Sequence, residues 1–479
     1  MILYFTESMP ENFGYDFYRK IGSPKFVLAP MVDQSELAWR LLARKYGAQL
    51  AYTPMFHAAN FVRDPSYRKE AMENSPIDRP LIYQFCSNDP AIFTEAAKLA
   101  QKHCDAIDLN LGCPQMIAKR GHYGSYLQDE WDLISEMLKT CVKEIKIPVT
   151  AKIRAQSTVE LTVTYAKMIE SCGISMLTIH GRTRDQKGVN TGLADWAVIK
   201  AVKEALSIPV IANGNILFYS DIERCIEATG ADGVMSAEGQ LHNPGIFMSS
   251  EPKSVWEMAL DYLVYAKEHP CNISYSRGHV FKLLHHSLHC HPQIREFISH
   301  AKDVDDLVAG VKELEKICGP LKCQANEEKL LELPFKHWLC QPYIRPIFQA
   351  FKQNENITSI DNGVKENSEI VKETESESSE NVIYKAVSMN NLKEQREEQR
   401  RRKKEARELC KENKAKKVKI EVLPCEACCC NMRGLKCRYN LCKTCCKKNP
   451  TNSPRCTGHS QLKPAKISSN PDSFVQIST

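Results

Sequence analysis

The sequence lacks the features that mark membrane and exported proteins. It contains no uninterrupted apolar run of about 18 residues, which is close to the minimum for a membrane-spanning helix. Its first residues include Glu7, Glu11 and Asp16, whereas a signal or transit peptide begins with Arg and Lys. We therefore expect a chain that is neither secreted nor inserted in a membrane, and that resides in the cytoplasm.

A dinucleotide-binding fingerprint is missing as well. No G-x-G-x-x-G motif follows an expected strand, so we do not expect a separate dinucleotide domain.

Cysteine, by contrast, is plentiful. Of 21 cysteines, eleven are scattered singly through the first 350 positions, which is typical of thiols in a reducing compartment. Nine more lie within residues 425–456, where their density indicates metal binding.

The fold class follows from eight short apolar runs, most of them rich in β-branched residues. Each is followed by helix-like sequence, and successive runs start 23 to 43 residues apart. This spacing leaves room for a helical crossover and is too long for hairpins, so the strands should be parallel. We predict an α/β fold, a (β/α)₈ TIM barrel with strands at residues 27–31, 50–56, 81–86, 106–111, 149–153, 176–180, 210–212 and 233–236.

The chain divides into five parts. Residues 1–250 should form the barrel, and residues 251–351, where long amphipathic segments replace strands, an appended helical domain. Residues 352–392 are rich in Ser, Asn and Glu and poor in aromatics, which indicates a disordered acidic linker. A basic helical segment at residues 393–420 and a Cys-rich module at residues 421–479 complete the chain.

Positive charge is concentrated in the last two parts. Residues 393–479 hold 22 Lys and Arg against 9 Asp and Glu, with a basic cluster at residues 400–404. Such a segment binds phosphates by releasing counterions, and it could also direct the chain to the nucleus. We therefore expect a nucleic-acid contact here, with a solvated helix as the alternative.

The Cys-rich module contains two C-x₂-C pairs. Cys425 and Cys428 form the first, Cys442 and Cys445 the second, and 13 residues separate the pairs. Each pair can present two thiolates to one tetrahedral ion, so we predict bound Zn²⁺. The additional cysteines and His459 leave the number of zinc sites open, and a disulfide cluster is the alternative.

Polar residues recur where the expected strands end. They are Asp33, Gln84, Asn110 with Cys113, Lys152 with Arg154, His180, Asn213 with Asn215, and Ala237-Glu238-Gly239. In a TIM barrel the loops after the strands build the active site, so these residues should meet at one end. A thiol on the Gly-Cys-Pro turn at Cys113 is placed to donate a proton or attack an electrophile. The backbone amides of residues 213–215 and 237–239 could bind a phosphate.

Two further groups have more than one interpretation. The loop at residues 119–126 contains two glycines, and it could be a lid in which Tyr123 or Tyr126 stacks on a base, or an ordinary solvated loop. The helical domain contains five histidines that, even with Cys290, match no standard ligand spacing: His279, His285, His286, His289 and His291. We expect a polar helix face there, with a nucleic-acid-facing surface as the alternative.

Taken in order, several of these segments resemble the tRNA-dihydrouridine synthases. The matching segments are A-P-M-V at residues 29–32, Gln84, L-N-L-G-C-P at 109–114, Y-G at 123–124, K-I-R at 152–154, I-H-G-R-T at 179–183 and N-G-N at 213–215. The resemblance extends over roughly residues 26–346. The segments at residues 33–35, 235–239 and 275–282 are most similar to the eukaryotic subgroup that acts at positions 16 and 17 of the D-loop.

The resemblance implies an FMN enzyme that uses NADPH, or NADH, to reduce the C5=C6 bond of a uridine in tRNA. Hydride from the reduced cofactor would reach C6, and Cys113 would donate a proton to C5. The cofactor would be held by Pro30, Met31 and Val32 on its ring system, by Gln84, Lys152 and His180 at its polar edge, and by Asn213, Gly214, Asn215, Ala237 and Glu238 at its phosphate. The tRNA would contact Asn110, Tyr123, Arg154, Arg277 and Lys282.

One residue departs from the family pattern. Glu238 stands where many relatives have Arg, and its carboxylate would repel a phosphate, so only its main-chain amide is assigned to the cofactor. Two other functions stay open: a flavin oxidoreductase acting on a small metabolite such as dihydroorotate, and a non-catalytic RNA-binding protein. A small substrate needs neither the helical domain nor the basic tail, and the presence of Cys113, Lys152 and His180 disfavours a non-catalytic role. We expect a monomer.

Overall fold

In the computed structural model, residues 13–320, 333–344, 425–428, 437, 439 and 441–448 are described. The chain divides into two compact units, Met1–Ile357 and Thr358–Thr479. The linker expected at residues 352–392 and the basic segment expected at residues 393–420 lie outside the described residues. Within the described ranges, every helix is too short or too polar to cross a membrane.

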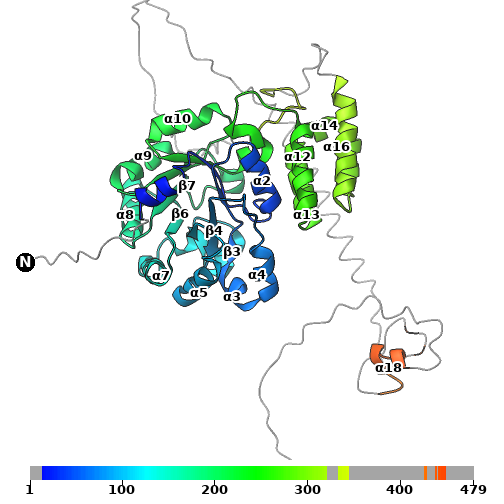
Figure 1. Cartoon of the computed structure of the whole chain (residues 1–479), viewed down its shortest axis with the longest axis horizontal. Helices are drawn as coiled ribbons and strands as arrows, with labels where there is room; N and C mark the ends of the chain where they lie inside the picture. Colours follow the sequence, from blue (N-terminus) through cyan, green and yellow to red (C-terminus); the bar gives the residue numbers. More distant parts are fainter. Residues whose placement is uncertain are drawn as a thin grey trace, which may run out of the picture. The chain divides into compact units, whose positions relative to one another are not determined.

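Parallel strands form a single sheet at the centre of the first unit (Figure 1). They are β1 (Phe26–Leu28), β2 (Leu50–Tyr52), β3 (Phe56–His57), β4 (Leu81–Cys86), β5 (Ala106–Leu111), β6 (Val149–Ala155), β7 (Met176–Thr183), β8 (Val210–Asn213) and β9 (Gly233–Ser236). Their spatial order is β2-β1-β9-β8-β7-β6-β5-β4-β3, and β2 also pairs with β4, which closes the sheet. The predicted (β/α)₈ barrel is therefore confirmed.

Five of the predicted strands have different bounds in the structure. Those expected at residues 149–153, 176–180 and 210–212 extend to Ala155, Thr183 and Asn213, and two others are shortened or divided. The strand expected at residues 27–31 ends at Leu28, and the run at residues 50–56 divides into β2 and β3, which pair with successive parts of β4. Proline explains both differences, because Pro30 and Pro54 have no N–H to donate to a neighbouring strand. The loop after β1 therefore begins early and carries residues 29–36 over the end of the barrel.

Helices follow most strands and cover the outside of the barrel (Figure 1). Their beginnings are fixed locally, since Asp89, Thr158 and Asp195 accept hydrogen bonds from amides in the first turns of their helices. The helices of the barrel are α1 (Tyr15–Lys20), α2 (Leu37–Lys45), α3 (Ala58–Arg63), α4 (Pro65–Ala71), α5 (Pro90–Ala100), α6 (Met116–Gly121), α7 (Trp131–Glu144), α8 (Val159–Glu170), α9 (Trp196–Ala205), α10 (Ser220–Thr229) and α11 (Glu238–His242), with 3₁₀ turns η1 (Gly124–Leu127), η2 (Gly188–Asn190) and η3 (Pro244–Phe247).

Five further helices stand side by side at one flank of the barrel, and we call them the helical domain (Figure 1). They are α12 (Val255–Glu268), α13 (Ile273–Leu283), α14 (Ser287–Cys290), α15 (Pro292–Ser299) and α16 (Val304–Cys318). α12 packs against both α2 of the barrel and α16. Residues 333–344, which we call the return segment, pass back across this domain, with Leu339 bridged to Ser254 at the start of α12.

Candidate active site

A chain of hydrogen bonds runs through the barrel interior to the turn that carries Cys113. Asp108 on β5 accepts from Thr150 Oγ1 at 2.7 Å and from Gln84 Nε2 at 2.8 Å. Gln84 Oε1 in turn accepts from Asn110 Nδ2 at 2.7 Å. Asn110 Oδ1 then accepts the backbone amide of Cys113 at 2.9 Å. Because residues 108 and 110 are two apart on one strand, their side chains share the inner face of the barrel.

Asp108 is the central member of this chain and is fully buried. Burial raises the pKa of Asp108 to about 7, although hydrogen bonds from Thr150 and Gln84 and the charge of Lys152 act in the opposite direction. No role for Asp108 is evident from the sequence; its only signal is a carboxylate on the same strand face as Asn110. Gln84, which the resemblance places at the edge of a cofactor, uses its oxygen and one N–H within the barrel.

The Cys113 turn is held on both sides by backbone hydrogen bonds. Besides the bond from its own amide to Asn110, the carbonyl of Cys113 accepts from the Ser125 amide at 3.1 Å and from Ser125 Oγ at 3.0 Å. Gly124 makes this approach possible, since its φ is +68° and a Cβ there would lie 2.8 Å from the Cys113 carbonyl oxygen. Burial raises the pKa of the Cys113 thiol, which is partly exposed, so it stays protonated at neutral pH.

Lys152 on β6 provides a buried amine at the same end of the barrel. Its Nζ donates to Asn213 Oδ1 at 2.9 Å, and Asn213 Nδ2 donates to the Met235 carbonyl at 2.9 Å. Burial, and then the charge of Arg154, lower the pKa of Lys152 to about 7. Burial and the charge of Lys152 also hold the pKa of His180 well below its ordinary value. The side chains of Lys152 and Asn213 thus meet across β7, the strand that carries His180 between them.

Arg182 joins His180 to the loop after β8. Its Nη1 lies 3.0 Å from His180 Nε2, and its Nη2 donates to Asn215 Oδ1 at 2.9 Å. Asn215 and Gly214 have φ values of +63° and +115°, so the chain turns sharply directly after β8. No role is assigned to Arg182 from the sequence. Its only signal there is its place in the I-H-G-R-T segment.

Three residues predicted to touch tRNA are engaged inside the protein, among them Asn110, which hydrogen-bonds to Gln84 and to the Cys113 amide. Arg154 donates to the carbonyls of Gly112 and Thr183, both at 2.9 Å, and so ties the loop after β5 to the end of β7. Burial lowers the pKa of Arg154 to about 10. The ring of Tyr123 is buried and meets His57 edge-on, with centroids 5.6 Å apart, so in this structure it does not face solvent for stacking on a base.

The predicted contacts in the helical domain are only partly solvated. Arg277 and Lys282 are both partly exposed, and Arg277 Nη1 donates to the Ser299 carbonyl at 2.9 Å. The expected polar helix face is wrong for His279. This residue is 0% exposed and stacks on Trp39 with ring centroids 4.0 Å apart. The periodicity of one helix cannot show this, because the barrel covers that face.

The residues at this end of the barrel fit a flat, phosphorylated cofactor. Val32 is 54% exposed, and Pro30 and Met31 beside it are partly exposed, so the loop after β1 presents an apolar surface. Lys152, Arg182 and the left-handed turn at Gly214 supply cationic and amide donors for an anion. Ala237 and Glu238, which begin the short α11 after β9, are partly exposed as well.

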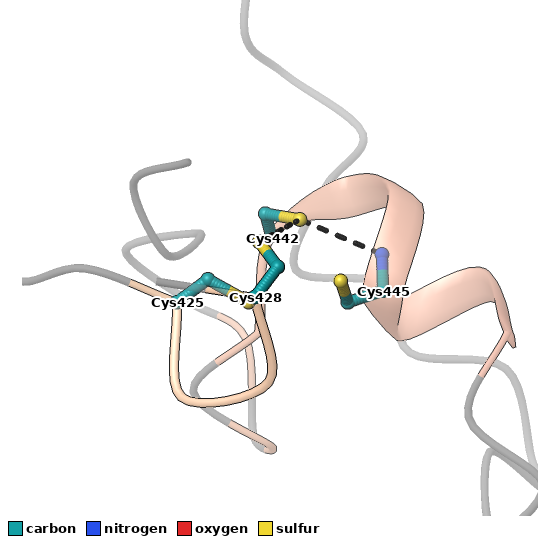
Figure 2. Close-up of side chains that lie close together, drawn as sticks. All are labelled: Cys425, Cys428, Cys442 and Cys445. Carbon is teal, nitrogen blue, oxygen red and sulfur yellow. Dashed lines mark hydrogen bonds between the residues drawn. The ribbon is translucent and has the colours of Figure 1, made fainter. Parts of the chain in front are cut away.

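The second unit contains four cysteines that converge, as Figure 2 shows. The sulfurs of Cys425, Cys428, Cys442 and Cys445 all lie within 4.8 Å of one another. Cys428 Sγ is 3.9 Å from Cys442 Sγ, which also accepts the Cys445 amide at 3.5 Å (Figure 2). Backbone amides, that of Cys442 first, lower the pKa of Cys425 to about 6 and so favour its thiolate. Two facing pairs of thiols are the donor set that Zn²⁺ prefers in structural sites.

Comparison with known proteins places these features in one family. The family model for dihydrouridine synthase matches residues 27–333. A tRNA-dihydrouridine(16/17) synthase-like protein of Mus musculus is 46% identical over 472 residues, which cover 96% of this chain and 92% of the mouse protein. The tRNA-dihydrouridine(16/17) synthase of Saccharomyces cerevisiae, whose name includes NAD(P)(+), is 43% identical, with 70% of this chain and 86% of the yeast protein covered. The chain belongs to the dihydrouridine synthase family.

Proposed function

We propose that the protein is a flavin-dependent oxidoreductase that reduces the C5=C6 bond of uridines at positions 16 and 17 of the tRNA D-loop. Its reductant is NADPH or NADH. One observation carries the proposal: the turn that holds Cys113 directly after β5 is fixed by hydrogen bonds to its amide and carbonyl, and the charges of Arg154 and Lys152 act on the thiol. The family of the chain and the names of its relatives give the substrate class.

FMN is the cofactor that fits the donor set at the barrel end. When bound, FMN would supply the hydride chemistry that links the nicotinamide to the uracil ring. Pro30, Met31 and Val32 would hold its rings against their exposed apolar surface, while Asn215, Gly214 and the amides of Ala237 and Glu238 would hold its phosphate. Lys152 and His180 would contact its polar edge, where Lys152 would offer a cation that stabilises negative charge in a buried setting.

Cys113 acts as the general acid. A group that gives a proton to uracil C5 must hold that proton at neutral pH, and the raised pKa of the Cys113 thiol ensures this. Asn110 and Ser125 fix the backbone of the turn on either side, so the sulfur is presented in one place. The buried Asp108 and Gln84 position Asn110 from beneath. These residues act through Cys113 rather than on the substrate.

The substrate uridine has to leave the base stack of the tRNA before its C5 can approach the thiol, because a barrel end cannot reach a stacked base. The helical domain is the surface that grips the rest of the tRNA, through Arg277, Lys282 and their neighbours. The Cys-rich module holds Zn²⁺ through Cys425, Cys428, Cys442 and Cys445, and together with the basic segment it adds affinity for RNA.

Purified protein with unmodified tRNA tests the proposal. Yellow protein that consumes NADPH only when tRNA is present, and that yields dihydrouridine at positions 16 and 17 by mass spectrometry, is the expected result. Turnover with dihydroorotate in the absence of RNA would favour a small-metabolite oxidoreductase instead. Colourless protein that binds tRNA without consuming NADPH would indicate a non-catalytic RNA-binding protein. Mass spectrometry of tRNA from cells that lack the protein identifies the target positions independently.

A further inference from the structure

Three potential metal ligands meet in the helical domain, although they are far apart in the sequence. His291 lies between α14 and α15, Cys318 is the last residue of α16, and His337 belongs to the return segment. Their ligand atoms all lie within 4.8 Å of one another. The sulfur of Cys318 is 3.3 Å from His291 Nε2, and the rings of His291 and His337 have centroids 5.5 Å apart.

These distances can be compared with those of a zinc site. With Zn–N bonds of about 2.0 Å and Zn–S bonds of about 2.3 Å, ligand atoms on one tetrahedral ion lie roughly 3.3 to 3.6 Å apart. The Cys318 and His291 pair already has this separation, at 3.3 Å. A thiol–imidazole hydrogen bond alone would account for that pair, but it gives no reason for a second imidazole to converge on the same point.

Burial and donor chemistry point the same way. Cys318 is 0% exposed, while His291 and His337 are partly exposed, so the cluster is shielded yet reachable from solvent. One thiolate and two imidazoles form a donor set that suits Zn²⁺ and disfavours Mg²⁺ or Ca²⁺, which require oxygen ligands. Three protein ligands leave a fourth position for a water molecule.

We propose that His291, Cys318 and His337 bind one Zn²⁺ ion, which fastens the return segment to the helical domain. The backbone around His337 is already held there: its carbonyl accepts from Ser287 Oγ at 2.8 Å, and the next carbonyl, of Trp338, accepts from the Val255 amide at 2.9 Å. An ion at this point joins the end of α16 to a segment that follows it in the chain. This site is separate from the Cys-rich module and does not depend on the enzymatic activity.

The metal content of the full-length protein tests the site. Zinc per chain is measured by inductively coupled plasma mass spectrometry for the wild type and for Cys318→Ser and His337→Gln. Each variant should lose about one equivalent of zinc, because two remaining ligands hold the ion too weakly. Cys340→Ser is the matched control, since Cys340 is a buried cysteine of the same return segment outside the cluster, and its zinc content should equal that of the wild type.

A second set of variants distinguishes zinc bound at this site from zinc bound by the Cys-rich module. The same comparison is made in a chain that also carries Cys425→Ser and Cys442→Ser, and the loss of about one equivalent should persist there. Substitution with Co²⁺ should give a thiolate-to-metal absorption band that Cys318→Ser abolishes in this background. If Cys318→Ser is insoluble, the more exposed His291→Gln and His337→Gln decide the outcome. Unchanged zinc content in the soluble variants would overturn the proposal and leave a simple hydrogen bond.

Discussion

The Nε2 atom of His279 lies 2.9 Å from Oε2 of Glu36, and this pair joins the helical domain to the barrel. Glu36 directly precedes α2 of the barrel, whereas His279 belongs to α13. Tyr262 on α12 donates to the other carboxylate oxygen of Glu36 at 2.9 Å. Because the His279 side chain is fully buried, the contact between the two parts of this unit contains a polar network rather than apolar packing alone.

His279→Ala should therefore destabilise the protein strongly. Removal of one partner from a buried pair leaves the other without compensation and costs about 3 to 5 kcal/mol. Denaturant unfolding of the purified chain measures the change. Glu144→Gln, which removes the partly exposed pair with Lys98, is the control and should cost less than about 1 kcal/mol. Equal effects of the two substitutions would contradict a special role for the buried pair.

The same pair predicts a pH dependence of stability. Burial alone would raise the pKa of Glu36, but the charge and hydrogen bond of His279 outweigh it and leave the pKa below the ordinary value of 4.5. The unfolded chain thus takes up this proton at a higher pH than the folded chain does, so the carboxylate stabilises the fold above pH 4.5 and the effect is lost as pH falls through the folded pKa. The difference in unfolding free energy between wild type and Glu36→Gln should shrink on acidification; a constant difference would argue against it.

Cys113→Ala should separate cofactor chemistry from uridine reduction. The variant is expected to bind flavin and accept electrons from NADPH normally, while reduction of tRNA uridine slows about 10² to 10⁴-fold for want of a general acid. Stopped-flow measurements of the two half-reactions give the comparison. Cys86→Ala is the matched control, because Cys86 is a buried cysteine in the same side-chain cluster. Near-wild-type turnover of Cys113→Ala would remove this thiol from the mechanism.

The rate of uridine reduction should also respond to alkaline pH through Cys113. The pKa of this thiol is raised above its ordinary value of 9.0, chiefly by burial, so the proton is present throughout the neutral range. The rate should stay level from neutral pH upward and decline only above that value, under conditions where flavin reduction is not limiting. A decline that begins near neutral pH would assign the limiting proton to another group.

Lys152→Ala should impair the cofactor rather than the proton donor. The buried amine, whose pKa is lowered to about 7 by burial, gains its charge most readily when an anion lies beside it. We expect weaker retention of flavin or slower reduction by NADPH, followed by visible absorbance. Lys143→Ala, on the outer helix α7, should leave both unchanged. Unaltered flavin content and reduction rate in Lys152→Ala would exclude this residue from the cofactor site.

The eight apolar runs gave the barrel because a strand buried on both faces is visible as a short continuous stretch. The ends of β1 and β2 are harder to predict than the presence of these strands, because a single proline decides where each stops pairing. Asp108 could not be recognised, because its importance comes from Thr150 and Gln84 on the neighbouring strands. The cluster of His291, Cys318 and His337 escapes any local motif for the same reason: its members meet only after the helical domain has folded.

The double anchoring of the Cys113 backbone also bears on how selectivity can arise. Because the amide and the carbonyl of Cys113 are both hydrogen-bonded, its sulfur can move only by rotation of the side chain. The turn that carries Cys113 therefore cannot shift toward a nucleobase that lies out of reach. The movement that brings the uracil ring to the Cys113 sulfur must therefore come from the tRNA. Under the proposed function, the enzyme therefore selects among uridines by the shape of the tRNA elbow. The uridine that is reduced is the one that moves far enough out of the folded RNA when the tRNA binds.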